Sequence, residues 1–229
     1  FRAPVWGHGE GPSGSFMFSP PRASGVVPQI TLMLGAQLAG TAYSPIMNDF
    51  VIMRKSPEVF MCLITPPVIK EVTGEEVSYQ ELGGTLVHAE KTGICDLVVE
   101  TDEEGIEKTR ELLSLLPSNY KECPPFVDTG DPADRREEKL LDIAFQEEKN
   151  MHEVIKSIAD NGHFFEIKPL FAKNIIIGFA RLNGQTAGIV ANNPEIKGGA
   201  IDIDASDKAA RFIRFCDAFN IPLIFWVDS

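Results

Sequence analysis

Residues 26–45, VVPQITLMLGAQLAGTAYSP, decide the fold. The part from Val26 to Leu34 is mostly apolar and partly β-branched, which predicts a strand that is buried on both faces. Small residues dominate from Gly35 through Ala42. If this turn opens a helix, two free backbone amides and the helix dipole can hold a developing oxyanion, a contribution of about 3–4 kcal/mol per donor. The same residues also suit a tight turn that needs glycine only for packing, and composition leaves both interpretations open.

Strands and helices alternate after this stretch. We predict a strand pair at 49–53 and 59–64, a short helix from Pro66 through Val72, and another strand at 95–100. Such alternation is typical of βαβ units, so we expect an α/β fold with a mostly parallel sheet.

A longer helix follows these strands. Thr101 and Glu104 have the spacing of a capping box, and Pro117 ends the helix. Its apolar side is predicted to consist of Ile106, Leu112, Leu113 and Leu116. This helix completes a first domain, which we expect to span residues 24–121.

The composition then shifts to Pro, Asp, Glu, Lys and Arg, which predicts a charged linker over residues 122–149. A second domain is expected over residues 150–229, and it opens with a helix at 151–159. The dipeptide Asn183-Gly184 separates apolar runs at 174–181 and 185–191. Because these two residues readily accept positive φ, the pattern predicts a β-hairpin.

The last predicted elements are a helix and a strand. Ser206 is placed to cap the helix, and a strand follows at 221–227. Apolar residues recur at helical spacing at Ala209, Phe212, Ile213, Cys216 and Phe219. We expect them to pack against a sheet.

The charge and composition exclude several classes of protein. Lys and Arg total 21 against 33 for Asp and Glu, and the net charge of -12 would repel nucleic acid. The 4 cysteines include no C-x-x-C pair, so we expect no metal site and a reducing, cytoplasmic compartment. No apolar run reaches the about 18 residues of a membrane span. Residues 1–23 are rich in Gly, Pro and Ser and are expected to form a poorly ordered arm.

No catalytic set of side chains is visible. The 4 histidines are scattered, and no serine lies in a G-x-S-x-G pattern. The run from Gly35 to Gly40 does not match G-x-G-x-x-G, and no P-loop is present. The turn after the first strand therefore remains the candidate for chemistry.

Several motifs along the sequence occur in the same order as in a known protein family. In the first half they are SGVVPQI at 24–30, a G-x-x-x-x-G-x-x-Y-S-P pattern at 35–45, VTGEEV at 72–77 and ELGG at 81–84. In the second half they are FFE at 164–166, KNIIIGFAR at 173–181, GIVANNP at 188–194 and ARFIRFCDAFNIP at 210–222. Together they resemble the carboxyltransferase subunit of biotin-dependent acyl-CoA carboxylases, above all propionyl-CoA carboxylase β subunits.

The resemblance implies a crotonase-like (ClpP/crotonase) fold of ββα repeats in two related domains, each incomplete in this chain. It also implies the reaction. In that family carboxybiotin releases carbon dioxide and accepts the α-proton of a short acyl-CoA, propionyl-CoA or acetyl-CoA, and the resulting enolate captures the carbon dioxide. Backbone amides hold the oxyanions, so no side-chain acid or base is required.

The resemblance also assigns roles to residues. The amides of Gly40 and Thr41 would be catalytic, holding the thioester oxygen. Substrate contacts would come from Gly25, Ala39 and Tyr43. The biotin side would be shaped by Asn192, Pro194, Gly198 and Gly199. The family usually has Gly at the position of Ala39 and Ala at that of Thr41, so a β-branched residue narrows this pocket.

Partners follow from the same resemblance. Biotin would be carried by a partner that includes a biotin carboxyl carrier, together with a biotin carboxylase. The active site would lie between the first domain of one subunit and the second domain of its neighbour in a homo-oligomer, a hexamer in the family. The compartment would be the cytoplasm, or the mitochondrial matrix in a eukaryote.

Other functions remain open at this level. A biotin-dependent decarboxylase or transcarboxylase, of the methylmalonyl-CoA or glutaconyl-CoA type, would use the same half-reaction. A crotonase-like hydratase would need a pair of glutamates, which the segment around Gly40 does not offer. The family continues past Asp228 to a second glycine pair, so we expect this chain to be a fragment without carboxyl transfer of its own.

Overall fold

The computed structural model describes residues 20–132, 134–144 and 150–228. A three-stranded parallel sheet in the order β1-β3-β5 consists of β1 (Ile30–Met33), β3 (Phe50–Arg54) and β5 (Leu97–Val99). Two short strands, β2 (Gln37–Leu38) and β4 (Met61–Cys62), form a separate parallel pair. The parallel pairing predicted for this part of the chain is confirmed. The predicted arm lies outside the described residues except for residues 20–23.

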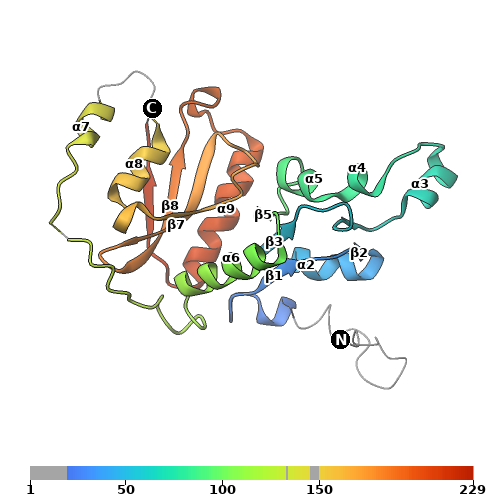
Figure 1. The fold of residues 1–229 in the computed structure, drawn as a ribbon, viewed down its shortest axis with the longest axis horizontal. Coiled ribbons are helices and arrows are strands. Elements are labelled where there is room, and N and C mark those ends of the chain that lie inside the picture. Colours follow the sequence, from blue (N-terminus) through green and yellow to red (C-terminus); the bar gives the residue numbers. More distant parts are fainter. Residues whose placement is uncertain (1–19, 133, 145–149, 229) are drawn as a thin grey trace.

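Helices accompany these strands (Figure 1). They are the 3-10 helix η1 (Ala39–Ala42), α2 (Tyr43–Met47), α3 (Pro66–Thr73), α4 (Tyr79–Gly83), α5 (Thr85–Glu90) and α6 (Asp102–Leu115). The longest, α6, lies against the sheet at Gly105, where a Cβ would come within 2.8 Å of the Leu32 side chain. Glycine therefore sets the close approach of this helix to β1.

The second half contains a four-stranded sheet in the order β6-β7-β8-β9, in which only β8 and β9 are parallel. Its strands are β6 (Phe164–Ile167), β7 (Ile175–Leu182), β8 (Gln185–Asn192) and β9 (Leu223–Trp226). The helices are α7 (Lys139–Ala144), α8 (Met151–Ile158), η2 (Asp160–Gly162), η3 (Lys197–Gly199) and α9 (Ile203–Ala218). The predicted hairpin is confirmed, because Asn183 and Gly184 have φ values of 50° and 79° between β7 and β8.

Two predictions about strands are wrong. The first strand covers only Ile30–Met33, and only Met33 in it is buried, because β1 is an edge strand of the described sheet. The residues predicted as a strand pair at 49–53 and 59–64 contribute to different sheets, β3 pairing with β1 and β5 while β4 pairs with β2. Local apolar content does not specify the pairing partner of a strand.

The helix predictions also need correction. In α6, Ile106 and Leu113 are 43% and 51% exposed, and the buried face is formed by Leu112 and Leu115. The Thr101 hydroxyl accepts a hydrogen bond from the backbone amide of Glu104, as predicted. The Glu104 carboxylate, however, accepts from the backbone amide of Glu100 rather than from that of Thr101.

The cap of α9 is likewise not the predicted one. Asp202, not Ser206, accepts a hydrogen bond from Ala205 at 3.0 Å and begins the helix. An aspartate at this position interacts favourably with the helix dipole as well.

The predicted linker is fixed to the second half by polar contacts. The Arg135 guanidinium donates to the carbonyls of Ser157 and Ala159 at 2.7 and 3.0 Å, and it pairs with Asp131 at 2.8 Å. Residues 133 and 145–149 of the linker lie outside the described residues. The described part of the linker is therefore bound to the end of α8 through Arg135.

The largest hydrophobic core draws side chains from both halves. Phe50 of β3 makes edge contacts with Phe179 of β7 and Phe215 of α9, at centroid distances of 6.0 and 4.6 Å. Leu112 and Leu115 of α6 belong to the same cluster. The packing of the α9 aromatics against a sheet is confirmed, whereas the division into two related domains stays a prediction.

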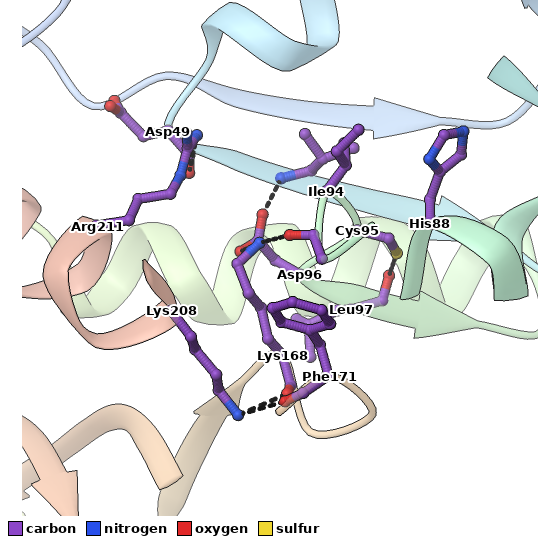
Figure 2. Close-up of polar contacts among 12 residues, drawn as sticks. Asp49, His88, Ile94, Cys95, Asp96, Leu97, Lys168, Phe171, Lys208 and Arg211 are labelled. Atoms are coloured by element: carbon purple, nitrogen blue, oxygen red, sulfur yellow. Dashed lines mark hydrogen bonds and ion pairs between the residues drawn. The ribbon is translucent and has the colours of Figure 1, made fainter. Parts of the chain in front are cut away.

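A buried ion pair joins the two halves (Figure 2). Asp96 precedes β5 and Lys168 follows β6, and the Lys168 Nζ lies 2.9 Å from Asp96 Oδ1 with both side chains at most 5% exposed. The other carboxylate oxygen accepts from the amide of Val51 at 2.7 Å. The Lys168 ammonium also donates to the carbonyl of Gly93. Both charges are therefore paired and hydrogen-bonded, as burial requires.

Replacing Lys168 with Met should destabilise the protein by about 3–5 kcal/mol, because the Asp96 carboxylate stays buried without its counter-charge. The measurement is the urea midpoint followed by circular dichroism. Lys55→Met is the matched control, since Lys55 pairs with Glu100 at 3.2 Å on the surface. This control should cost less than about 1 kcal/mol. Equal shifts of the two midpoints would contradict the role assigned to the buried pair.

Candidate functional site

The turn after β2 is the first candidate site. Leu38 ends β2, and η1 begins at Ala39, whose backbone has a φ of 49°. A left-handed backbone is costly for a residue other than glycine, at about 1–2 kcal/mol. In a 3-10 helix the amides of Ala39 and Gly40 precede the first i→i−3 hydrogen bond, so they have no acceptor within the helix. The turn therefore has the open helix start that oxyanion binding requires.

Thr41 lies one step further into the helix. Its hydroxyl donates to the carbonyl of Leu38 at 2.8 Å and accepts from the amide of Leu38 at 3.1 Å. The Thr41 amide is in 3-10 register with the same carbonyl, so amide and hydroxyl share one acceptor. The predicted donor role of the Thr41 amide stays a prediction.

The predicted substrate contacts lie in different places. Tyr43 opens α2 and is 43% exposed. Gly25, with a φ of 70°, lines a cavity of about 330 Å³ together with Asn48, Asp49 and Arg211. The residues that line this cavity do not include Gly40 or Thr41.

Arg211 lies next to Asp49 beside this cavity, and its guanidinium donates to the Asp49 main-chain carbonyl at 3.3 Å (Figure 2). The Asp49 carboxylate accepts from the amide of Gln29 at 2.8 Å. Burial raises the pKa of Asp49, against the lowering effects of the Gln29 hydrogen bond and of Arg211. The Arg211 guanidinium donates to the carbonyl of Asn48 at 2.7 Å, which fixes the end of α2 to α9.

The structure brings together three of the four residues predicted for the biotin side. A Cβ on Gly199 would lie 2.5 Å from the Asn192 side chain and 3.5 Å from Pro194. Gly198 has open space around it, with a φ of 63°. The Asn192 carboxamide makes two hydrogen bonds to the main chain of Asp228, donating at 2.5 Å and accepting at 2.9 Å. Asn192 therefore joins the ends of β8 and β9.

The two candidate sites lie in different parts of the molecule. In Figure 1, β2 and the turn that follows it lie on the side of α2 that faces away from α9 and β8. Gly40 belongs to the turn after β2, and Asn192 ends β8.

Sequence reasoning missed Lys208, which is 2% exposed on α9. Its ammonium donates to the carbonyls of Lys168, Phe171 and Ile175 at 2.8–2.9 Å and to that of Ala172 at 3.3 Å. Figure 2 shows Lys208 reaching the segment that carries Lys168 and Phe171. A signal was present in the sequence, because Lys208 shares the apolar stripe of Ala205 and Phe212 at spacings of three and four residues.

Two further observations concern the described part of the chain. No three His, Cys, Asp or Glu side chains gather there in a way that could hold a metal ion. None of its helices has both the length and the apolarity needed to cross a membrane.

Known proteins share this fold and sequence. The chain matches the carboxyl transferase domain family over residues 10–229. It superposes on transcarboxylase 12S, in a structure described as a hexamer assembly with hydrolysed methylmalonyl-coenzyme A bound, with a TM-score of 0.89 and 41% identity. That match covers 94% of this chain and 42% of the other. The α/β fold is thus the fold of that carboxyltransferase.

Relatives agree with this match. The α subunit of methylmalonyl-CoA decarboxylase from Veillonella parvula is 44% identical over 94% of this chain and 43% of its own length. The mitochondrial propionyl-CoA carboxylase β chain of Homo sapiens is 44% identical over 90% of this chain and 39% of its own length. This chain belongs to the carboxyl transferase domain family, and the resemblance found in the sequence is confirmed. It spans about two fifths of the length of these relatives.

The burial of Lys208 should make the stability of the protein depend on pH. Burial lowers the pKa of Lys208 from 10.5 to about 8, although Glu166 opposes this shift. The folded protein then releases the proton before the unfolded chain does, so Lys208 adds stability as the pH rises from about 8 toward 10.5.

The free energy of unfolding of wild type minus Lys208→Met should therefore increase over that window. Urea unfolding below and within the window measures this difference. Lys156→Met, at an exposed lysine of α8, is the matched control. A difference that stays constant with pH would refute the role of Lys208.

The loop of Gly198 and Gly199 offers a second prediction. Both glycines have positive φ, so alanine at either costs about 1–2 kcal/mol of backbone strain. Only Gly199→Ala also forces a Cβ against Asn192. Gly199→Ala should lower the melting temperature more than Gly198→Ala, as measured by differential scanning calorimetry. The reverse order would show that Asn192 is not packed on Gly199.

Proposed function

We propose that this chain is part of a carboxyltransferase that moves a carboxyl group between carboxybiotin and the α-carbon of a short acyl-CoA. The observation that carries the proposal is the open helix start at Ala39 and Gly40, in a turn with a left-handed residue and no ionisable side chain from Gly35 through Ala42. Such a turn suits a reaction whose charge develops on a thioester oxygen. Propionyl-CoA or acetyl-CoA is the proposed acceptor.

The Gly40 amide is the central donor in this proposal. Removing the α-proton of an acyl-CoA leaves an enolate, and the negative charge on its oxygen is stabilised by backbone N–H groups that are already oriented. The Thr41 amide is the proposed second donor. Gly25, Ala39 and Tyr43 are proposed to line the path of the acyl-CoA.

Biotin, carried on a partner protein, would supply the carboxyl group and accept the α-proton. The residues proposed for its side are Asn192, Pro194, Gly198 and Gly199. Gly198 leaves open space beside this loop, whereas Gly199 is covered by Asn192. Asn192 would not contact biotin with its own polar atoms, since the oxygen and the nitrogen of its carboxamide both bond to the main chain of Asp228. Its proposed role is to hold that main chain in position.

A second copy of the protein is proposed to complete the site. The turn after β2 and the end of β8 lie apart in one chain (Figure 1), so one turn would face the loop of a neighbouring subunit. The hexamer described for transcarboxylase 12S supports such an assembly. A biotin carboxyl carrier and a biotin carboxylase are the further partners that carboxylation would require.

A second candidate function is a biotin-dependent decarboxylase, supported by the 44% identity to the methylmalonyl-CoA decarboxylase subunit. The two functions differ in the direction of transfer. The full-length protein and its partners can be given methylmalonyl-CoA and biotin with and without ATP. Loss of the carboxyl group without ATP favours the decarboxylase, and ATP-dependent carboxylation of propionyl-CoA favours the carboxylase.

Gly40→Pro tests the proposed oxyanion donor, because proline lacks the amide hydrogen. We expect carboxyl transfer by the assembled full-length enzyme to fall by about 100-fold or more in kcat. Gly35→Ala is the control, since Gly35 has open space around it and no positive φ. The urea midpoint of each variant reports folding separately. A folded Gly40→Pro enzyme with wild-type kcat would refute the proposed donor.

A further inference from the structure

The N-cap of η1 is unusual because its residue has no polar side chain. Leu38 occupies this position, and both of its main-chain polar groups bond to the Thr41 hydroxyl, the carbonyl at 2.8 Å and the amide at 3.1 Å. A capping box normally uses Ser or Thr at the cap and Glu or Gln three residues later. Here the Thr41 hydroxyl, at the third helical position, forms hydrogen bonds with both the amide and the carbonyl of the cap residue.

The residue between these groups is strained. Ala39 has a φ of 49°, a conformation that glycine adopts freely and alanine does not. Strain of this kind persists only where the surroundings enforce it. On one side, the backbone amide of Gln37 donates a hydrogen bond to the carbonyl of Phe60 at 2.9 Å, which holds Gln37 in place. On the other side, the Thr41 hydroxyl ties the chain back to Leu38, so Ala39 is spanned by a short polar loop.

Two donors are close to one acceptor at this turn. The Leu38 carbonyl accepts the Thr41 hydroxyl, and the Thr41 amide is in 3-10 register with it. Without the hydroxyl, only the amide would remain to satisfy that carbonyl. The Leu38 amide would also lose its acceptor, so both hydroxyl bonds that span Ala39 would be gone and Ala39 could relax to a right-handed backbone.

We propose that the Thr41 hydroxyl is a positioning group, which holds Ala39 in its left-handed conformation and thereby presents the Gly40 amide to the thioester oxygen. The role rests on the proposed carboxyl transfer. It assigns to the side chain of Thr41 a function distinct from that of its amide. The proposal also predicts that positions 39 and 41 are coupled, because a glycine at position 39 would adopt the left-handed conformation without the Thr41 hydroxyl.

Two substitutions at position 41 separate the hydroxyl from the shape of the side chain. Thr41→Val keeps the β-branched shape and loses the hydroxyl, whereas Thr41→Ser keeps the hydroxyl. In the full-length enzyme with its partners, we expect Thr41→Val to lower kcat for propionyl-CoA by about tenfold with little change in KM, less than the about 100-fold from losing a donor outright. Thr41→Ser should recover most of this loss.

Hydrogen exchange supplies a readout that does not depend on turnover. The Leu38 amide should exchange faster in Thr41→Val than in wild type, because its acceptor is removed. Thr73→Val is the matched control, since the Thr73 hydroxyl donates to the Ile69 carbonyl at 2.9 Å on α3. This control should change neither the exchange of Leu38 nor kcat.

A double-mutant cycle tests the coupling of the two positions. Ala39→Gly should restore most of the kcat lost in Thr41→Val, and this gain should exceed whatever change Ala39→Gly makes in the Thr41 background. Equal effects of Ala39→Gly in both backgrounds would overturn the proposal, and so would wild-type kcat and Leu38 exchange in Thr41→Val. A wild-type enzyme without activity on any acyl-CoA would instead overturn the proposed function, and with it this positioning role.

Discussion

The pairing of Asp96 with Lys168 is the constraint on which the rest of the structure depends. The two charges are buried where the parallel sheet of the first half meets the second half, and they lie 2.9 Å apart. Their main chains are joined as well, since the amide of Lys168 donates to the Asp96 carbonyl at 2.9 Å. A buried pair is a weak source of net stability, but an arrangement that separated Asp96 from Lys168 would leave a buried charge without its partner, which is strongly unfavourable. The pair thus fixes how the two halves fit together.

From this pair, contacts extend to the candidate site. The Lys168 carbonyl accepts from Lys208, which anchors α9 at its first turns. Three residues further along α9, Arg211 holds the carbonyl of Asn48 at the end of α2. Because α2 directly follows η1, the turn at Gly40 is attached to a helix whose position is set from the core. Preorganised donors of this kind need such support, since their value depends on their direction at the moment of reaction.

Sequence reasoning predicted the elements whose signals are local. The hairpin at Asn183-Gly184 follows from the positive φ that these residues tolerate, and the helix after Pro66 follows from proline at its start. The helices α4 and α5 and the strand β6 were not predicted, since their short segments carry weak periodicity. The candidate turn could be located from its small residues. The left-handed backbone of Ala39 could not, because alanine gives no local reason to adopt it.

By itself, the sequence determined the alternation of strands and helices, the hairpin, the acidic charge and the carboxyltransferase family, because these depend on residues that are near neighbours or on ordered motifs. Only the tertiary structure decided which strands pair, which lysines are buried and how the Thr41 hydroxyl is used. Asp96 and Lys168 lie 72 positions apart in the numbering, and nothing near either residue indicates the other. Contacts of that separation arise from packing of the whole chain, where a charge is buried only if its partner arrives with it.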